Sequence, residues 1–258
     1  MDHWRSRKNP EGGVGGISRR RYILLSPASS IEGKVIHVRR LGPQPADQPA
    51  EWTAVREICC RTGNDGKPVA GERWNFFARL WIEPYEKICP GWTYIAEGDG
   101  AIVGYLTGCP DTRAFARKKL WRFTFPLLWN IARGAYPDNK DAGRFLRQFF
   151  YLDRETERGF PRRFRSELKR FYPAHLHINV QAEWRGLGIG KRLVDHFREN
   201  LKSVGVAGVH LYCGERPVKF YLKIGFSELA RVEFHGRPVF ALSWRPGDPT
   251  LDRPPSLV

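Results

Sequence analysis

Apolar residues recur along the chain with two different periods. Alternating or continuous apolar runs, which are typical of strands, occupy residues 34–39, 93–97, 101–107, 174–180, 208–213, 229–234 and 239–244. Helical spacing of apolar residues occurs in 52–60, 72–83, 188–204 and 216–223. Strands that alternate with helices predict an α/β domain.

Local signals place several element boundaries. Gly98-Asp99-Gly100 between two apolar runs predicts a hairpin turn. Gly205 is expected to end the helix over 188–204. The helix over 72–83 has large apolar residues at helical spacing, and we expect them to pack in the core: Trp74, Phe77, Leu80 and Trp81.

The chain divides into a basic leader, a single domain and a short tail. We expect residues 1–33 to be flexible, because they combine little apolar content with many glycine and basic residues. The domain spans 34–244 and includes a basic, aromatic-rich and mostly helical insertion over 112–173. Residues 245–258 form a Pro-rich tail.

The charge of the chain is strongly basic and unevenly spread. Its 258 residues have a formal net charge of +16, from 43 Lys or Arg and 27 Asp or Glu. Such a charge either favours acidic partners or only keeps the protein dispersed. Aromatic residues beside arginine, as in Trp121-Arg122-Phe123 and Phe164-Arg165, suit base stacking or the buried faces of amphipathic helices. Nucleic acid is therefore a partner to test, but we do not favour it.

Cysteine and hydropathy patterns bear on location. The five cysteines form no C-x-x-C pair and show no metal-ligand spacing with histidine. They fit reduced, buried thiols, so we expect no metal and a cytoplasmic location. No apolar run is long enough to span a bilayer, and we expect no membrane partner.

The run from Gln181 to Lys191 is rich in glycine and lies between a predicted strand and a predicted helix. Backbone N–H groups and the positive end of a helix dipole meet at such a turn and attract anions. A Walker loop needs G-x-x-x-x-G-K-[ST], but Arg192 follows Lys191 here. The glycines also read G-x-G-x-G rather than the dinucleotide pattern G-x-G-x-x-G.

Arg185 to Gly190 match R-x-x-G-x-G, and Phe220 to Phe226 match F-Y-x-x-x-G-F one helix and one strand later. With both motifs, the chain resembles the GCN5-related N-acetyltransferases (GNATs). The resemblance implies a mixed central sheet with helices on both faces. The sheet is splayed between its fourth and fifth strands, and here a helical insertion precedes the fourth. It also implies transfer of an acetyl group from acetyl-CoA to an amine, which the sequence does not identify.

The resemblance also implies site residues. The pantetheine arm of acetyl-CoA would lie along Ile178, Asn179 and Val180. Its pyrophosphate would bind the run formed by Arg185, Gly186, Leu187, Gly188, Ile189, Gly190 and Lys191. Tyr221 occupies the position of a tyrosine that protonates the leaving thiolate; otherwise it only packs against the cofactor.

The general base is less defined. His175 and His177 lie on one face of a predicted strand, and a histidine near its ordinary pKa of about 6.5 is a suitable base. For either one alone, a hydrogen-bonded structural role in lining the cleft is the favoured alternative. Asp111 is a further candidate, with a helix N-cap as its alternative role.

Two departures favour an alternative function. Many family members have Asn where this chain has Gly214, and Pro217 replaces a small helical residue. The chain is also similar, over about 34–244, to the acetyltransferase-like C-terminal domain of O-GlcNAc hydrolases. The segments that resemble it are 58–63, the strand of Gly104 and Tyr105 that ends in 110–115, and 172–178. This subgroup includes domains thought inactive, so the alternative is a catalytically inactive acetyl-CoA-binding or protein-interaction module.

Overall fold

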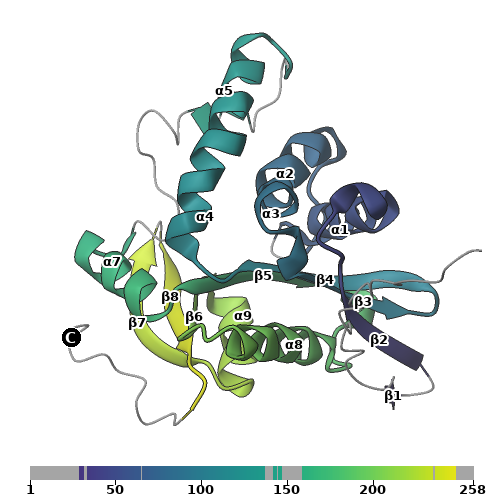
Figure 1. Ribbon diagram of the computed structural model, residues 1–258, viewed down its shortest axis with the longest axis vertical. Helices are drawn as coiled ribbons and strands as arrows, with labels where there is room; N and C mark the ends of the chain where they lie inside the picture. Colours follow the sequence, from purple (N-terminus) through teal and green to yellow (C-terminus); the bar gives the residue numbers. More distant parts are fainter. Residues whose placement is uncertain are drawn as a thin grey trace, which may run out of the picture.

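A single mixed sheet organises the molecule. The computed structural model describes residues 29–31, 34–64, 66–136, 142–143, 145–146, 159–234 and 236–247. Within them, eight strands lie in the order β1-β2-β3-β4-β5-β6-β8-β7 (Figure 1). The strands are β1 (Ser29–Ile31), β2 (Lys34–Arg40), β3 (Thr93–Gly98), β4 (Ala101–Cys109), β5 (Ala174–Val180), β6 (Val209–Gly214), β7 (Ser227–Phe234) and β8 (Arg237–Trp244).

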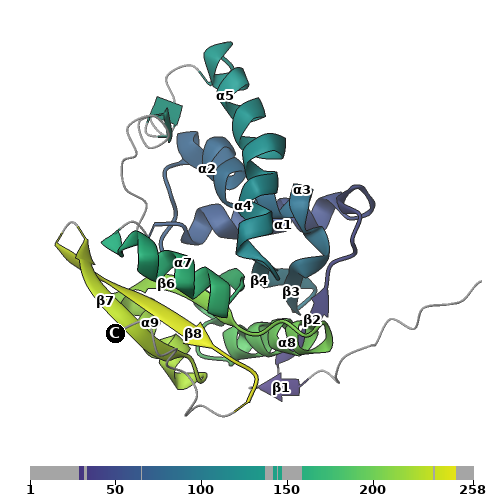
Figure 2. The same cartoon turned by 60° about the vertical axis from the view of Figure 1, so that its left-hand side comes forward.

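Helices cover both faces of this sheet. They are α1 (Pro49–Thr62), α2 (Trp74–Trp81), α3 (Glu83–Ile88), α4 (Thr112–Lys119), α5 (Phe125–Ala132), α7 (Arg162–Phe171), α8 (Ile189–Ser203) and α9 (Glu215–Lys223). The first three lie over one face and α8 lies under the other (Figures 1 and 2). Alternate strand residues therefore enter different cores. Leu106 packs with Leu193 of α8, whereas the adjacent Tyr105 packs with Trp52 of α1.

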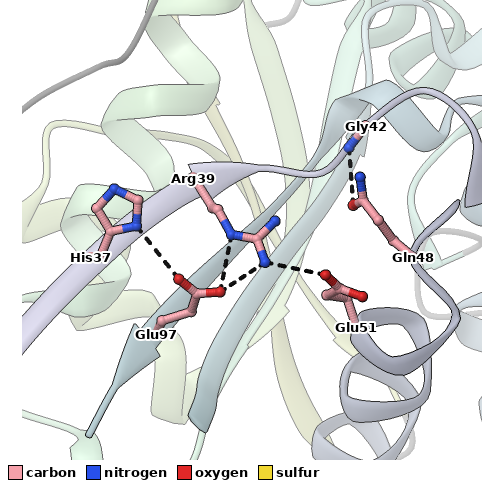
Figure 3. A network of polar contacts seen from close by, with 6 residues as sticks. All are labelled: His37, Arg39, Gly42, Gln48, Glu51 and Glu97. Carbon is pink, nitrogen blue, oxygen red and sulfur yellow. Dashed lines mark hydrogen bonds and ion pairs between the residues drawn. The ribbon is translucent and has the colours of Figure 1, made fainter. Parts of the chain in front are cut away.

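Charged side chains connect the outer strands to α1 (Figure 3). The guanidinium of Arg39 on β2 donates to the Glu97 carboxylate on β3 at 2.8 and 3.0 Å and lies 3.3 Å from Glu51 of α1. His37 lies 3.5 Å from the same Glu97 carboxylate. These contacts are part-exposed, so we assign them to alignment of α1 on the sheet rather than to a large gain in stability.

The sheet is splayed where β5 meets β6. These two strands are parallel and pair only at Ala174↔Val209 and His175↔His210. In contrast, β5 pairs with β4 along six positions, from Gly104↔Val180 to Cys109↔His175. The rest of β5 thus diverges from β6, as the resemblance implied for the fourth and fifth strands of the family.

The seven predicted strands are confirmed to within two residues at each end. The sequence missed β1, which lies inside the predicted leader and pairs with β2; residues 1–28 of that leader lie outside the described residues. The predicted helix over 72–83 is wrong in its extent, because α2 ends at Trp81 and α3 follows. Pro84 explains the break, since it has no N–H to donate to the Leu80 carbonyl four residues earlier and is tolerated only in the first turn of α3.

The predicted insertion is helical where the structure describes it. A π-helical turn (Leu120–Thr124) joins α4 to α5, and α7 leads back to β5. Its other residues between 137 and 158, apart from short helical pieces at 142–143 and 145–146, lie outside the described part. Within the part of the chain that the structure describes, no helix is both long and apolar enough to cross a bilayer.

Candidate active site

The glycine-rich run forms a turn between β5 and α8. Gly186 and Gly188 have φ angles of +86° and +73°, in the left-handed region that favours glycine. Around both, the space beside the backbone is open, because an added Cβ would meet no heavy atom within 4 Å. The sequence therefore uses glycine at these two positions for backbone conformation.

Free backbone donors gather at the start of α8. Gly188 is the N-cap and has no side chain to cap the helix. The first bond into the helix runs from the Arg192 N–H to the Gly188 carbonyl at 3.1 Å. The N–H groups of Ile189, Gly190 and Lys191 therefore have no carbonyl partner within the helix. With the helix dipole, they form an electropositive site that suits an anion.

Gly190 has a different role from the other two glycines. A Cβ at this position would lie 2.9 Å from Cζ of Phe220 on α9. The absence of a side chain thus lets α9 pack closely against the first turn of α8. This contact joins the two motifs that the sequence analysis linked only by spacing.

The backbone of β5 faces the splay at alternate residues. The Gln181 N–H donates to the Val103 carbonyl at 2.9 Å, toward β4, whereas the Ala174 N–H donates to Gly208 at 3.1 Å, toward β6. Because backbone groups alternate along a strand, those of Ile178 and Val180 face the β6 side. This is the edge that the resemblance assigned to pantetheine.

Two basic side chains of the loop already have protein partners. Arg185 donates through Nε to the Val180 carbonyl at 3.0 Å and through Nη2 to the Gly66 carbonyl at 3.4 Å. Lys191 forms an ion pair with Asp195 at 2.6 Å. Both side chains are exposed, so a phosphate would compete with these contacts. Leu187 and Ile189 direct their side chains into the core instead.

Tyr221 lies in the core on the α8 side of the sheet. It is buried with Leu176 and Leu193, and its ring contacts Phe220 and Phe226 at centroid distances of 5.1 and 5.4 Å. Burial raises the pKa of Tyr221 above its ordinary value, with a further contribution from the neighbouring Cys213. The phenol therefore keeps its proton at neutral pH, as an acid catalyst must before it acts.

His175 is held on both sides of its ring, on the opposite face of β5. Its Nε2 lies 2.9 Å from the Tyr85 hydroxyl. Its Nδ1 lies 2.8 Å from the Thr112 hydroxyl and 3.1 Å from the Cys109 sulfur. Since both ring nitrogens have partners, the arrangement matches the structural interpretation of this histidine.

His177 has hydrogen-bond partners at Nε2. Its Nε2 lies 3.0 Å from the Tyr105 hydroxyl and 3.1 Å from the Asn179 amide nitrogen, which also donates to Tyr105 at 2.9 Å. An amide N–H directed at Nε2 makes that nitrogen the acceptor of the neutral ring. The proton of the neutral imidazole is then on Nδ1.

The pKa values of both histidines lie below the ordinary value of about 6.5 on which their role as a base depends. Burial lowers the pKa of His177 to about 4. Burial also lowers the pKa of His175 well below its ordinary value, and the charges of His210 and Lys119 act in the same direction. Both rings are neutral at neutral pH. A base with such a low pKa, however, is poorly suited to take a proton from the ammonium group of the substrate that receives the acetyl group.

Three aromatic residues that the sequence did not predict as site residues surround these histidines. Trp81 was expected in the core, but it is 48% exposed and stacks on His177 with ring centroids 5.5 Å apart. Tyr85 and Tyr105 supply the hydroxyl groups described above. The Trp81 indole thus forms part of the surface beside β5, and its exposure could not be read from helical spacing.

Two further positions have structural roles at helix ends. The Asp111 carboxylate accepts from the Arg113 and Ala114 N–H groups at 2.8 and 3.0 Å, which confirms the N-cap reading of this residue. Gly214 is the N-cap of α9 and provides no capping side chain. An added Cβ at Gly214 would meet no heavy atom within 4 Å.

Two cavities lie beside the site. One of about 360 Å³ is bounded by Gly66, Trp74 and residues 181–183, next to the Arg185 contacts. A larger one, of about 750 Å³, lies among α1, α2 and α3 and contains ion pairs such as Arg56–Glu86. No group of three or more potential metal-binding side chains occurs among the residues that the structure places.

Comparison with known proteins agrees with this geometry. A family model described as "Acetyltransferase (GNAT) domain" matches residues 147–228, which include β5, the glycine turn, α8, β6 and α9. The crystal structure of SsHAT aligns with a TM-score of 0.59 and 26% identity, over 81% of this chain and 98% of that chain.

The fold is the GNAT fold. These two matches support the GNAT acetyltransferase family, and with it acyl transfer in general and acetyl-CoA as the partner. More distant structures include Ard1 from Thermoplasma volcanium, with a TM-score of 0.46 and 13% identity, over 83% of this chain and 99% of that one. Another is the ribosomal-protein-S18-alanine N-acetyltransferase from Escherichia coli, with a TM-score of 0.44 and 12% identity, over 81% and 93% of the two chains.

Proposed function

We propose that this protein is an acyl-CoA-dependent N-acetyltransferase that moves the acetyl group of acetyl-CoA to an amine by direct attack. The observation that supports it most is the turn of Gly186 and Gly188, which leaves the first N–H groups of α8 free beside the splayed edge of β5. An anion site and an unpaired strand edge side by side match the pyrophosphate and pantetheine of one ligand.

In this proposal, the backbone positions the cofactor. The N–H groups from Gly186 to Lys191 bind the pyrophosphate, whereas that of Arg185 already donates to the Ala182 carbonyl at 3.2 Å. The backbones of Ile178 and Val180 line the pantetheine arm, and Asn179 between them pairs with β4. The Val180 carbonyl accepts a bond from Arg185, so either the pantetheine displaces that bond or it uses Ile178. A fixed thioester next to a bound amine supplies the proximity that acyl transfer needs.

The proposed chemistry is a single displacement. The lone pair of the neutral amine attacks the thioester carbon, and the C–S bond breaks after charge has built on the carbonyl oxygen. Tyr221 gives its proton to the departing thiolate, and the attacking nitrogen loses a proton to water. The Tyr221 phenolate then regains a proton from water, which restores the acid. Neither histidine takes that proton, because His175 is hydrogen-bonded at both nitrogens and the pKa of His177 is lowered to about 4.

The same histidine geometry favours a second candidate, a catalytically inactive acetyl-CoA-binding module. Neither His175 nor His177 has a pKa near neutrality, and Gly214 offers no side chain to the cofactor. The proposed similarity to the O-GlcNAc hydrolase domain agrees with this alternative. Two of its segments meet, because the Thr112 hydroxyl lies 2.8 Å from Nδ1 of His175.

The test is isothermal titration of acetyl-CoA into the parent protein, a Gly188→Ala variant and a Gly205→Ala variant. Gly205 is the matched control, since its φ of +69° imposes the same backbone strain at the far end of α8. Each substitution is expected to lower stability by about 1 kcal/mol. Only Gly188→Ala should weaken acetyl-CoA binding, by tenfold or more.

The outcomes separate the candidates. Binding by the parent, followed by release of free CoA with an amine acceptor, supports the enzyme. Binding without turnover across a panel of small amines and peptides supports the inactive module. Absence of binding by a folded parent would contradict both.

A further inference from the structure

A helical arm of the insertion exposes aromatic side chains. We define the α4–α5 arm as residues 112–132, which run through the π-helical turn as one rod extending away from the sheet (Figures 1 and 2). Trp121, Phe125 and Trp129 recur every four residues along it. They are 68%, 43% and 62% exposed.

The other side of the arm is buried, so its exposed face is not needed for the core. Phe123 and Leu127 pack against Phe76 of α2. On the exposed face, Trp121 and Phe125 lie against each other with ring centroids 4.9 Å apart. Neighbouring exposed aromatics of this kind are uncommon on a monomer and mark a surface that binds something.

Basic residues surround the exposed aromatics. The sequence from Thr112 to Tyr136 contains no Asp or Glu, and its basic residues are Arg113, Arg117, Lys118, Lys119, Arg122 and Arg133. Arg117, Lys118 and Arg122 are exposed. The Arg133 guanidinium lies 5.3 Å from the Trp129 ring centroid.

The charged residues of the arm lie outside α5. The eight residues of α5, from Phe125 to Ala132, contain no charged side chain. The basic residues precede α5 in α4 and the π-helical turn, and Arg133 follows it. At a lipid interface, Trp, Phe and Leu enter the acyl boundary and Arg and Lys contact the phosphates. The arm exposes residues of both kinds.

We propose that the exposed face of the α4–α5 arm binds an anionic membrane surface. The basic residues contact lipid phosphates, and Trp121, Phe125 and Trp129 enter the headgroup region. The expectation of no membrane partner considered only spanning segments, and interfacial binding requires none. Nucleic acid is a poorer fit, because an uncharged helix would leave the phosphate backbone without partners along α5.

Vesicle flotation tests this proposal with the full chain. Large unilamellar vesicles of three parts phosphatidylcholine to one part phosphatidylglycerol are compared with vesicles of phosphatidylcholine alone. The parent should float with the anionic vesicles and be released by high salt. The triple variant Trp121→Ser/Phe125→Ser/Trp129→Ser should bind at least tenfold more weakly. The variant Arg117→Gln/Lys118→Gln/Arg122→Gln should lose on the order of a hundredfold.

A matched variant changes three exposed apolar residues elsewhere, Val35→Ser/Val204→Ser/Leu222→Ser. It should float like the parent, and circular dichroism should show native helix content in every variant. The proposal is overturned if the parent binds neither vesicle. It is also overturned if the aromatic variant floats with the anionic vesicles as the parent does, and differs from the parent only in dimerisation, in RNA binding or in its unfolding temperature. Those results would assign the face to a second copy, to nucleic acid or to this chain itself.

Discussion

The Asn179 amide nitrogen lies 3.1 Å from Nε2 of His177, two residues away on the same strand. This contact and the Tyr105 hydroxyl identify Nε2 as the accepting nitrogen of the neutral ring, and burial lowers the pKa of that ring to about 4. Protonation of Nε2 would replace an acceptor by a donor that faces the amide N–H, which is unfavourable.

A pH-dependent stability follows from His177. The pKa of His177 is about 4 in the folded state and about 6.5 in the unfolded state. Between these values the unfolded chain binds more protons, so the free energy of unfolding should fall as the pH falls from 6.5 toward 4. The full effect is at most about 3 kcal/mol. Urea titrations at pH 7 and pH 4.5 should show a smaller loss in His177→Gln than in the parent. Equal losses would mean that the ring is not held neutral.

Tyr221→Phe tests the proposed acid. The variant keeps the ring and its contacts with Phe220 and Phe226, so acetyl-CoA affinity should stay within about twofold. The turnover number should fall about a hundredfold or more, a typical loss for a general acid. Tyr94→Phe is the control, because Tyr94 is buried in the same apolar cluster. An unchanged turnover number in Tyr221→Phe would leave Tyr221 with a packing role.

Asp111→Ala should affect stability and not chemistry. The carboxylate caps α4 through two backbone N–H groups, and loss of such a cap costs about 1 kcal/mol. Urea denaturation measures this loss, which Asp111→Ser should largely restore. Turnover per folded molecule should equal that of the parent. A collapse of turnover in a folded Asp111→Ala variant would return this residue to the list of candidate bases.

Gly214→Asn restores the residue that many GNAT proteins have at this position. The N-cap backbone is extended, with φ −81° and ψ −175°, and the space beside it is open. An asparagine side chain should therefore cap α9 and add a few tenths of a kcal/mol. If its amide also reaches the pantetheine, titration should show tighter acetyl-CoA binding. Weaker binding would indicate that the open space is itself part of the cofactor path.

The sequence predicted the glycine turn and the strands around it because their signals are local. Positive φ at Gly186 and Gly188, and the alternation within β5, follow from residue type and spacing. The contact between Gly190 and Phe220 joins elements that are 30 positions apart, so only the folded chain shows it.

The properties of the histidines could not be predicted from spacing. Placement of His175 and His177 on one face was correct, since strand periodicity determines it. Their low pKa values depend on burial beneath α2 and α3, and α3 itself was missed. Likewise, helical spacing placed Trp81 on an apolar face. It did not show that Trp81 is exposed and stacks on His177.

The two-position pairing of β5 with β6 leaves a strand edge inside the molecule without a neighbouring strand along most of its length. Edges of this kind recruit strands from other molecules, and they are a common origin of aggregation. Under the proposed function, pantetheine occupies that edge and shields it. Acetyl-CoA or CoA in the buffer should then keep concentrated samples monodisperse, so that a substrate also serves as the stabilising additive.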